Sequence, residues 1–313
     1  MKAIILTTPG TTDNFSYRNI ELPHIKDQEV LIEVKSISIN PIDIKTRKGQ
    51  GAFLYANLDP AKEYILGWDI SGVVTQSHSP AFKPGDEVFG MVNFPGIGAT
   101  YAEYVAAPAN QLAKKPANIS HAEAAGATLA ALTAWQNIVN KGTVKPGDRI
   151  LIHAAAGGVG HYAVQIAKHF GAYVIGTSSA ANKDFVLSLG ADEHIDYKTR
   201  QLVENVDPVD LVIDGLGYQS ALDSLDLIKP GGMLISISAP ITPETREKAA
   251  KFSIAAEFTS VRPNGTDMNS LAEVLHSGAI RSYISKTFAF IGMAEAHHAI
   301  ESGRTIGKIV VNL

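Results

Sequence analysis

The sequence predicts an α/β protein with two domains, a doubly wound parallel sheet and a mostly β, barrel-like domain. Three observations support this prediction. From Arg149 onward, short apolar runs alternate with segments of helical periodicity, which is typical of βα units. A glycine-rich turn joins the first apolar run to the first helical segment. Residues before about 118 carry short runs punctuated by Gly and Pro instead, which indicates a separate β-rich domain.

The turn is Ala155-Ala-Gly-Gly-Val-Gly160, which matches the dinucleotide fingerprint G-x-G-x-x-G with its first glycine replaced. The run Ile150 to Ile152 predicts the strand before it, and the apolar spacing up to Phe170 predicts the helix after it. Gly157 lets the backbone approach a pyrophosphate, and Gly160 lets the helix pack closely on the strand. The N–H groups at the helix N-terminus then face the phosphate charge. The alternative is a turn of small residues that binds nothing, and the βα units that follow favour the dinucleotide.

The residues after the second predicted strand are polar but not acidic. That strand spans 172–176 and is followed by Thr177-Ser-Ser-Ala-Ala-Asn-Lys183, where an NAD site would place a carboxylate on the ribose 2′-hydroxyl. No Asp or Glu occurs between the start of that strand and Asp184. Hydroxyl groups and a lysine suit a 2′-phosphate, so the sequence predicts NADPH. A solvated helix lysine is the alternative for Lys183.

Composition excludes several classes of protein. The 313 residues are 45 % hydrophobic and 19 % charged, which allows two separate cores. The net charge of −4 argues against nucleic acid and anionic membranes as partners. Cysteine is absent, which removes disulfides, thiolate metal sites and cysteine nucleophiles. The apolar run at the N-terminus is too short for a signal peptide, and no later run is long enough to span a membrane, so we expect a cytoplasmic protein.

The order of elements sets the predicted boundaries. A capping box at Ser120-His-Ala-Glu123 opens a helix and places a boundary near Ile119. The first domain is therefore 1–119 with 280–313, and the nucleotide domain is 120–279. Strands are expected over 3–6, 30–36, 70–74, 87–91, 100–106, 193–197, 209–214, 233–238, 254–261, 283–290 and 308–311, helices over 133–139, 185–189, 220–228 and 293–302, and a turn over 229–232.

This order resembles the medium-chain dehydrogenase/reductase superfamily. Four segments resemble its zinc-free quinone oxidoreductase branch, namely Asn40-Pro-Ile-Asp43, Phe82-Lys-Pro-Gly-Asp-Glu-Val-Phe-Gly90, His153-Ala-Ala-Ala-Gly-Gly-Val-Gly160 and Gly307-Lys-Ile-Val-Val311. The resemblance covers nearly the whole chain. It implies a Rossmann domain that binds NADPH, a GroES-like domain, and a homodimer formed through an edge strand of the nucleotide domain.

Zinc-dependent members carry a Cys near the position of Ile39 and Gly-His-Glu where this chain has Gly67-Trp68-Asp69. A catalytic zinc needs about three protein ligands. The pair His297-His298 is the one metal candidate, but adjacent helical residues point in different directions, so we expect surface polar residues and no metal.

The resemblance also implies roles for individual residues. Asn40 reaches the nicotinamide ribose or the substrate, and Asn40 and Lys48 are candidate donors to the enolate oxygen. Asp43 is a candidate catalytic carboxylate, although a structural role is favoured. The other implied cofactor contacts are Thr133, Ala156, Gly157, Gly158, Val159, Thr177, Ser178, Ser179, Lys183, Tyr197, Gly217, Ser238 and Lys308. A turn with an Asx cap at 40–43 and a half-buried strand tyrosine at Tyr197 are the alternatives.

The predicted function is hydride transfer from NADPH to a small-molecule quinone or α,β-unsaturated carbonyl. The basic pair Arg47-Lys48 is similar to the corresponding segment of the enone and alkenal reductases of the branch. The sequence therefore does not decide between a quinone and an α,β-unsaturated carbonyl as the acceptor. One alternative is a metal-free alcohol dehydrogenase, which needs a Tyr–Lys or His proton relay. The other is a non-catalytic NADPH-binding redox sensor.

Overall fold

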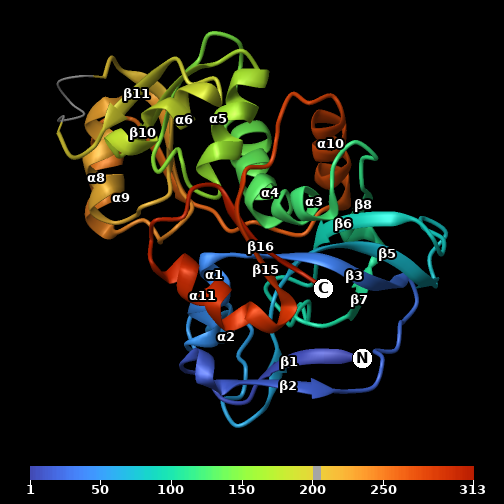
Figure 1. Ribbon diagram of the computed structural model, residues 1–313. Coiled ribbons are helices and arrows are strands. Elements are labelled where there is room, and N and C mark those ends of the chain that lie inside the picture. The colour runs from blue at the N-terminus through green and yellow to red at the C-terminus, as the bar shows by residue number, and fades with distance from the viewer. Residues whose placement is uncertain (200–205) are drawn as a thin grey trace. The chain divides into compact units, whose positions relative to one another are not determined.

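The computed structural model describes residues 1–199 and 206–313 (Figure 1). The chain divides into two compact units. The first contains residues 1–132, 262–278 and 282–313, and the second contains residues 133–261 and 279–281. None of the helices in these described residues is long and apolar enough to cross a bilayer.

The first unit is built on two sheets. One has the strand order β15-β16-β3-β5-β6-β8, with β7 paired to β3, and the other has the order β2-β1-β4. Its core gathers the β-branched residues that predicted the strands, including Ile32, Ile70 and Val88, all of which are inaccessible to solvent. The strands are β1 (Lys2–Leu6), β2 (Phe15–Asn19), β3 (Glu29–Ile39), β4 (Tyr64–Ile65), β5 (Asp69–Ser77), β6 (Glu87–Met91), β7 (Tyr104–Pro108), β8 (Leu112–Lys114), β15 (Ile284–Ala289) and β16 (Lys308–Asn312).

The C-terminal tail returns to this unit, as predicted. Strand β16 pairs antiparallel with β3, with Val311 opposite Ile37, and parallel with β15. In Figure 1 the red β15 and β16 lie beside the blue β3. The helices of the unit are α1 (Pro41–Arg47), α2 (Ala52–Tyr55), α3 (His121–Gly126), α10 (Gly265–His276) and α11 (Met293–Glu301), and α4 (Leu129–Trp135) begins in it.

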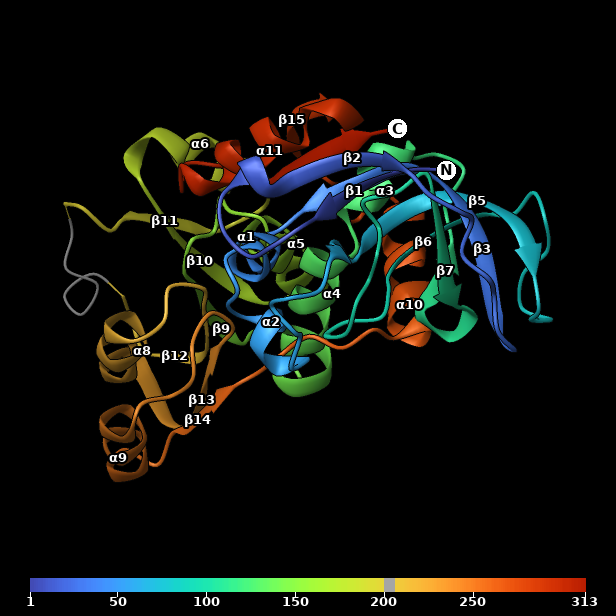
Figure 2. The same cartoon turned by 90° about the horizontal axis from the view of Figure 1, so that it is seen from below.

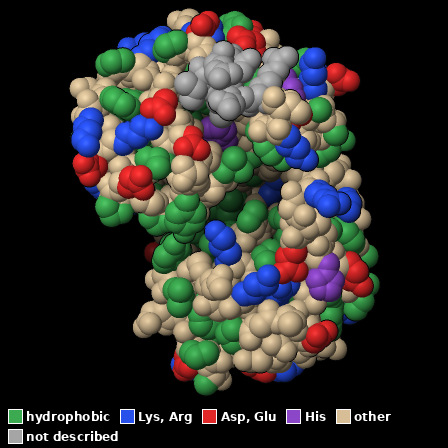
Figure 3. Space-filling model, turned by 90° about the vertical axis from the view of Figure 1, so that its left-hand side faces the viewer, with side chains coloured by type: hydrophobic (Ala, Val, Ile, Leu, Met, Phe, Trp, Pro, Cys, Tyr) green, Lys and Arg blue, Asp and Glu red, His purple; other side chains and the backbone are tan. Residues whose placement is uncertain are grey.

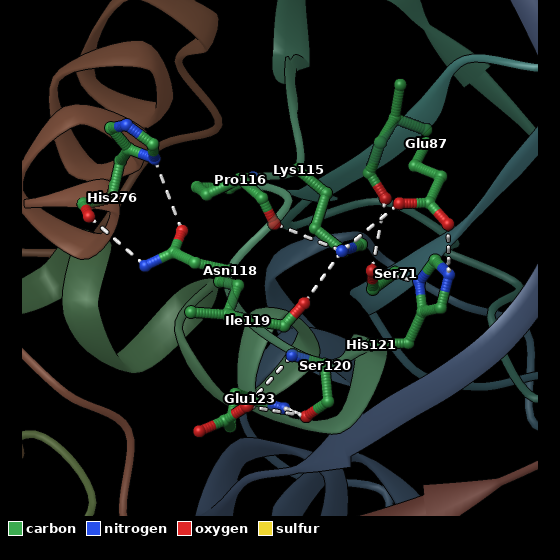
Figure 4. Close-up of polar contacts among 11 residues, drawn as sticks. Ser71, Glu87, Lys115, Pro116, Asn118, Ile119, Ser120, His121, Glu123 and His276 are labelled. Carbon is green, nitrogen blue, oxygen red and sulfur yellow. Dashed lines mark hydrogen bonds and ion pairs between the residues drawn. The ribbon is translucent and has the colours of Figure 1, made fainter. Parts of the chain in front are cut away.

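The unit boundaries differ from those predicted at 119 and 280. The capping box is present, because Glu123 Oε2 accepts from Ser120 N at 2.8 Å, but His121 on the same helix bonds Ser71 of β5 at 2.8 Å (Figure 4). Helix α10 is likewise tied to the first unit, since Asn118 Nδ2 donates to the carbonyl of His276 at 3.1 Å. These contacts place both helices with the barrel-like unit, and sequence patterning carries no information about such long-range packing.

The second unit holds a parallel sheet in the order β11-β10-β9-β12-β13-β14, which is the predicted doubly wound arrangement. Helices α8 and α9 lie on one face of it and α5 lies on the other (Figure 2). The elements are β9 (Arg149–Ile152), α5 (Gly160–His169), β10 (Tyr173–Ser178), α6 (Lys183–Ser188), β11 (Glu193–Asp196), β12 (Val209–Asp214), α8 (Gln219–Ser224), β13 (Ile228–Ser236), α9 (Pro243–Lys251) and β14 (Ala255–Phe258).

Three local predictions in this unit need correction. The turn expected at 229–232 lies inside β13, where the pairing with β12 shifts register and Gly231 takes a φ of 82°. The helix expected over 220–228 stops at Ser224 and is followed by a short 3₁₀ turn. The helix expected over 133–139 is the end of α4 followed by a π-helical turn, Gln136–Lys141.

Charged side chains of both signs are interspersed on the molecular face drawn in Figure 3, outside the grey residues. This distribution agrees with the small net charge of the chain.

Candidate functional site

The predicted dinucleotide turn lies between β9 and α5. A Cβ atom on Gly160 would lie 2.2 Å from the carbonyl oxygen of Ala154 and 2.7 Å from Cα of Ala155, so only glycine allows the helix to start this close to the strand. Gly157 N donates to the same Ala154 carbonyl at 2.8 Å and closes the turn. His161 N donates to the Gly157 carbonyl at 3.0 Å and Ala163 N donates to the Val159 carbonyl at 2.9 Å, so the turn is continuous with the N-terminus of α5, whose dipole favours an anion.

A buried histidine that the sequence analysis missed anchors this turn. His153 Nε2 lies 2.9 Å from Ser224 Oγ, and its Nδ1 lies 3.1 Å from Thr177 Oγ1. Ser224 Oγ donates to the Ser220 carbonyl, so it accepts from Nε2–H, and Nδ1 accepts the proton of Thr177. Burial lowers the pKa of His153, which keeps the ring neutral. The Thr177 hydroxyl donates to His153, and its place around the ribose phosphate stays a prediction.

The remaining candidates for that phosphate gather at the ends of two neighbouring strands. Strands β10 and β11 pair in parallel with Ser178 opposite Asp196, so Ser179 and Tyr197 follow side by side. Ser178 Oγ lies 2.8 Å from His194 Nε2. Lys183 is exposed at the start of α6, and Tyr197 is 55 % exposed.

Lys198 was missed by the sequence analysis, although it directly follows Tyr197. Its Nζ lies 6.0 Å from the centre of the Tyr197 ring. The ends of these strands and the start of α6 therefore offer a hydroxyl, a phenol and two cations, which are the groups that a 2′-phosphate requires. They belong to Ser179, Tyr197, Lys183 and Lys198.

The ends of β12 and β13 bring Gly217 and Ser238 together. Gly217 has a φ of 80°, and a Cβ on it would lie 2.7 Å from Ser238 Oγ. The Asp214 carboxylate holds this loop by accepting from Gly217 N at 2.8 Å. Ser238 Oγ is buried and has no hydrogen-bond partner among the described residues. A glycine cradle and an unpaired hydroxyl at one edge of the sheet fit a dinucleotide.

Two other predicted contacts, Thr133 and Ala156, are also buried in this unit. Thr133 lies on α4, where its carbonyl accepts from Asn137 Nδ2 at 2.7 Å, and Ala156 belongs to the turn after β9.

The first unit contains a buried polar cluster around Asn40, at the end of β3. Asn40 Nδ2 donates to Asp69 Oδ2 at 2.7 Å, and Lys308 Nζ donates to Asn40 Oδ1 at 2.5 Å. All three side chains are at most 3 % exposed. The partners come from β5 and β16, and no local sequence signal relates them to Asn40.

Asp43 lies in the same cluster. Its Oδ2 accepts from Asn40 N at 2.8 Å and caps helix α1. Burial, together with the nearby charge of Asp69, raises the pKa of Asp43 to about 7. Burial also raises the pKa of Asp69 and lowers the pKa of Lys308. The capping contact supports the structural role that was favoured for Asp43.

Arg47 and His297 are both buried, which corrects the prediction for His297. Arg47 donates to Glu301 Oε1 at 2.7 Å and to the Gly10 carbonyl at 3.1 Å. His297, expected at the surface, lies 3.4 Å from Arg47 Nη1 and 3.0 Å from the Tyr101 hydroxyl. Burial and the Arg47 charge lower the pKa of His297 to about 3, so it is neutral. These contacts tie α1 to α11 and to the segments around Gly10 and Tyr101.

Lys48 does not converge with Asn40. It is half exposed and pairs with Glu301 at 2.7 Å. Asn40 precedes α1 and Lys48 follows it. Eight residues at the α-helical rise separate the two by about 12 Å along the axis. In this structure Lys48 contacts Glu301 and Asn40 contacts Asp69 and Lys308, so the two candidate donors are not brought together.

The described residues contain no group of three or more His, Asp or Glu side chains that could hold a metal ion. Trp68, at the position of the zinc-ligand histidine in the related motif, is buried and donates from Nε1 to the Gly96 carbonyl at 2.7 Å.

Known proteins resemble this chain over its whole length. Two family models match, "Alcohol dehydrogenase GroES-like domain" over residues 26–117 and "Zinc-binding dehydrogenase" over residues 189–311. The mitochondrial NAD(P)H oxidoreductase of Danio rerio is 30 % identical, with 100 % of this chain and 91 % of the relative covered.

A chloroplastic protein of Arabidopsis thaliana named NADPH-dependent alkenal/one oxidoreductase is 32 % identical over 99 % of this chain and 79 % of its own length. The solved quinone oxidoreductase of Coxiella burnetii superposes with a TM-score of 0.92 at 34 % identity, covering 100 % of this chain and 99 % of that one.

Proposed function

This chain belongs to the quinone oxidoreductase and enone reductase branch of the medium-chain dehydrogenase/reductase family, and we propose that it reduces its acceptor without zinc. The enzyme uses NADPH and reduces quinones or α,β-unsaturated carbonyls. One observation carries the zinc-free part of the proposal. Asp69, which stands where the zinc-dependent motif has a metal-adjacent Glu, is held instead by Asn40 Nδ2 and by Leu129 N at 3.0 Å.

Bound NADPH would supply the hydride, and the protein would supply orientation and electrostatic stabilisation. Gly157, Gly158 and Val159 would hold the pyrophosphate at the N-terminus of α5. Ser179, Lys183 and Tyr197 would bind the ribose phosphate, and the Ser238 hydroxyl, which has no hydrogen-bond partner among the described residues, would donate toward the nicotinamide end. Asn40 donates from Nδ2 to the acceptor oxygen as negative charge develops on it. A proton from solvent completes the reduction, so the chain needs no general acid.

We also propose that the protein is a cytoplasmic homodimer. Strand β14 forms one edge of the parallel sheet and ends at Phe258, which is 39 % exposed. Within residues 1–199 and 206–313 this edge has no further strand, and an exposed aromatic residue at its end supports strand pairing between two copies. Sedimentation equilibrium tests the dimer, and imaging of the tagged protein in its own cell tests the location.

The proposed reaction is tested by following NADPH oxidation with a panel of quinones and α,β-unsaturated ketones and aldehydes, with and without a chelator. Turnover that prefers NADPH to NADH and survives the chelator supports the proposal. Tight NADPH binding without turnover on any acceptor supports the redox-sensor alternative. Chelator-resistant oxidation of simple alcohols, without enone reduction, supports a metal-free alcohol dehydrogenase.

A further inference from the structure

The amide of Asn40 is held between two opposite charges. An ammonium group can only donate hydrogen bonds, so the Lys308 contact fixes Oδ1 on the lysine side. A carboxylate can only accept, so the Asp69 contact fixes Nδ2 on the aspartate side. A flipped amide would place donor against donor and acceptor against acceptor. The two contacts therefore define one orientation.

Both charged partners are themselves anchored. Asp69 Oδ1 accepts from the backbone N–H of Leu129 at 3.0 Å, and Lys308 Nζ also donates to the Ile39 carbonyl at 3.2 Å. Nδ2 of an asparagine carries two N–H groups, of which Asp69 takes one. The orientation of the amide thus fixes the direction of the second N–H.

We propose that Asp69 and Lys308 are positioning residues that aim the second Nδ2–H of Asn40 at the carbonyl oxygen of the acceptor. Lys308, which the sequence suggested as a cofactor contact, then acts through Asn40 instead. This inference rests on the proposed function, because the oxygen in question is that of the quinone or enone.

Kinetics can test whether the two residues act through Asn40. A misplacement of about 1 Å costs about 10²-fold in rate, so we expect Lys308→Met, Asp69→Asn and Asn40→Ala each to lower kcat by about that factor. Residues that act as one unit are not additive, so adding Lys308→Met to Asn40→Ala should lower kcat by less than about twofold more. The dissociation constant for NADPH should stay unchanged in all of these variants.

A second readout needs no turnover. The side-chain amide protons of Asn40, identified by their loss in Asn40→Ala, should exchange slowly with solvent in the NMR spectrum. Loss of one charge-assisted hydrogen bond should raise that exchange rate by about tenfold in Lys308→Met or Asp69→Asn. If a single variant does not fold, the double variant Asp69→Asn/Lys308→Met removes both charges together and serves for both readouts.

Lys115 provides a matched control. It is a second buried lysine of the same unit, with its side chain 5 % exposed, and it donates to the Pro116 and Ile119 carbonyls and pairs with Glu87 (Figure 4). Lys115→Met removes the same charge at a site that does not contact Asn40. It should leave kcat and the Asn40 exchange rate unchanged.

The outcomes are separable. An undiminished effect of Lys308→Met in the Asn40→Ala background, or an unchanged exchange rate of the Asn40 amide, would overturn the inference. A wild-type protein that turns over no acceptor contradicts the proposed function, and in that case the exchange measurement still decides whether Asp69 and Lys308 orient the amide.

Discussion

Gly160→Ala is the substitution for which the structure predicts the largest effect on the dinucleotide turn. The added Cβ would lie 2.2 Å from the Ala154 carbonyl oxygen, 2.7 Å from Cα of Ala155 and 2.9 Å from the carbonyl carbon of Ala154. All three are backbone atoms, so no side chain can rotate away. A tolerable carbon–oxygen contact requires the helix and the turn to separate by about 1 Å.

That separation has two measurable consequences. Overpacking of this kind costs about 1–3 kcal/mol of stability. The N–H groups that would face a bound pyrophosphate move with the helix, and a misplacement of about 1 Å should lower kcat/KM by about 10²-fold. Thermal unfolding and fluorescence titration with NADPH measure the two effects. Gly292→Ala is the control, because the nearest atoms to its new Cβ lie at 3.7 Å and its φ is −88°.

If Gly160→Ala bound NADPH as tightly as the wild type while Gly292→Ala did the same, α5 would not form the phosphate site. Weak binding by both variants would point to a general loss of stability instead.

Three further predictions follow from the buried charges and the polar strand ends. Arg47→Ala removes a buried side chain together with its contacts to Glu301, His297 and the Gly10 carbonyl, and should lower the free energy of unfolding in urea by about 3–5 kcal/mol. Lys48→Ala loses only a half-exposed contact to the same Glu301 and should cost less than about 1 kcal/mol. Equal costs would contradict the buried role of Arg47. Burial raises the pKa of Asp43 from 3.8 to about 7 in the folded protein. The contribution of protonated Asp43 to the free energy of unfolding is therefore fully present below about pH 4 and is lost as the pH rises through about 7. Asp43→Asn should therefore gain stability relative to wild type between about pH 4 and pH 8 in urea titrations, and a difference independent of pH would count against the raised pKa. Ser179→Asp places a carboxylate where a 2′-phosphate would bind and should shift the ratio of dissociation constants toward NADH, so an unchanged ratio would remove Ser179 from the phosphate site.

Local signals in the sequence were sufficient for most of the fold. Alternation located β3, short apolar runs located β6 and β12, and the glycine-rich turn located the junction of β9 and α5. These features depend on residues close together in the chain. The turn expected at 229–232 was wrong because Pro and Gly can also occupy an irregular strand once tertiary pairing supports it.

The buried polar clusters could not be predicted in the same way. Arg47 meets His297 across 250 positions of sequence, and Asn40 meets Lys308 across 268. A charged residue in a helix looks solvated in the sequence, because its burial depends on a partner that only the folded chain supplies. Asp69 drew notice in the sequence only as the third residue of Gly67-Trp68-Asp69, where zinc-dependent members have Gly-His-Glu. That departure was the one available signal for its place beside Asn40.

The most direct test of the central claim is the transfer of deuterium from NADPH that carries deuterium at both C4 positions, using an α,β-unsaturated ketone as acceptor in the presence of a chelator. We expect the label on the β-carbon of the saturated product, while the proton added at the neighbouring carbon comes from solvent. Oxidation of labelled NADPH with no deuterium in the product, or complete loss of turnover on adding the chelator with recovery on adding zinc, would contradict a zinc-free hydride transfer.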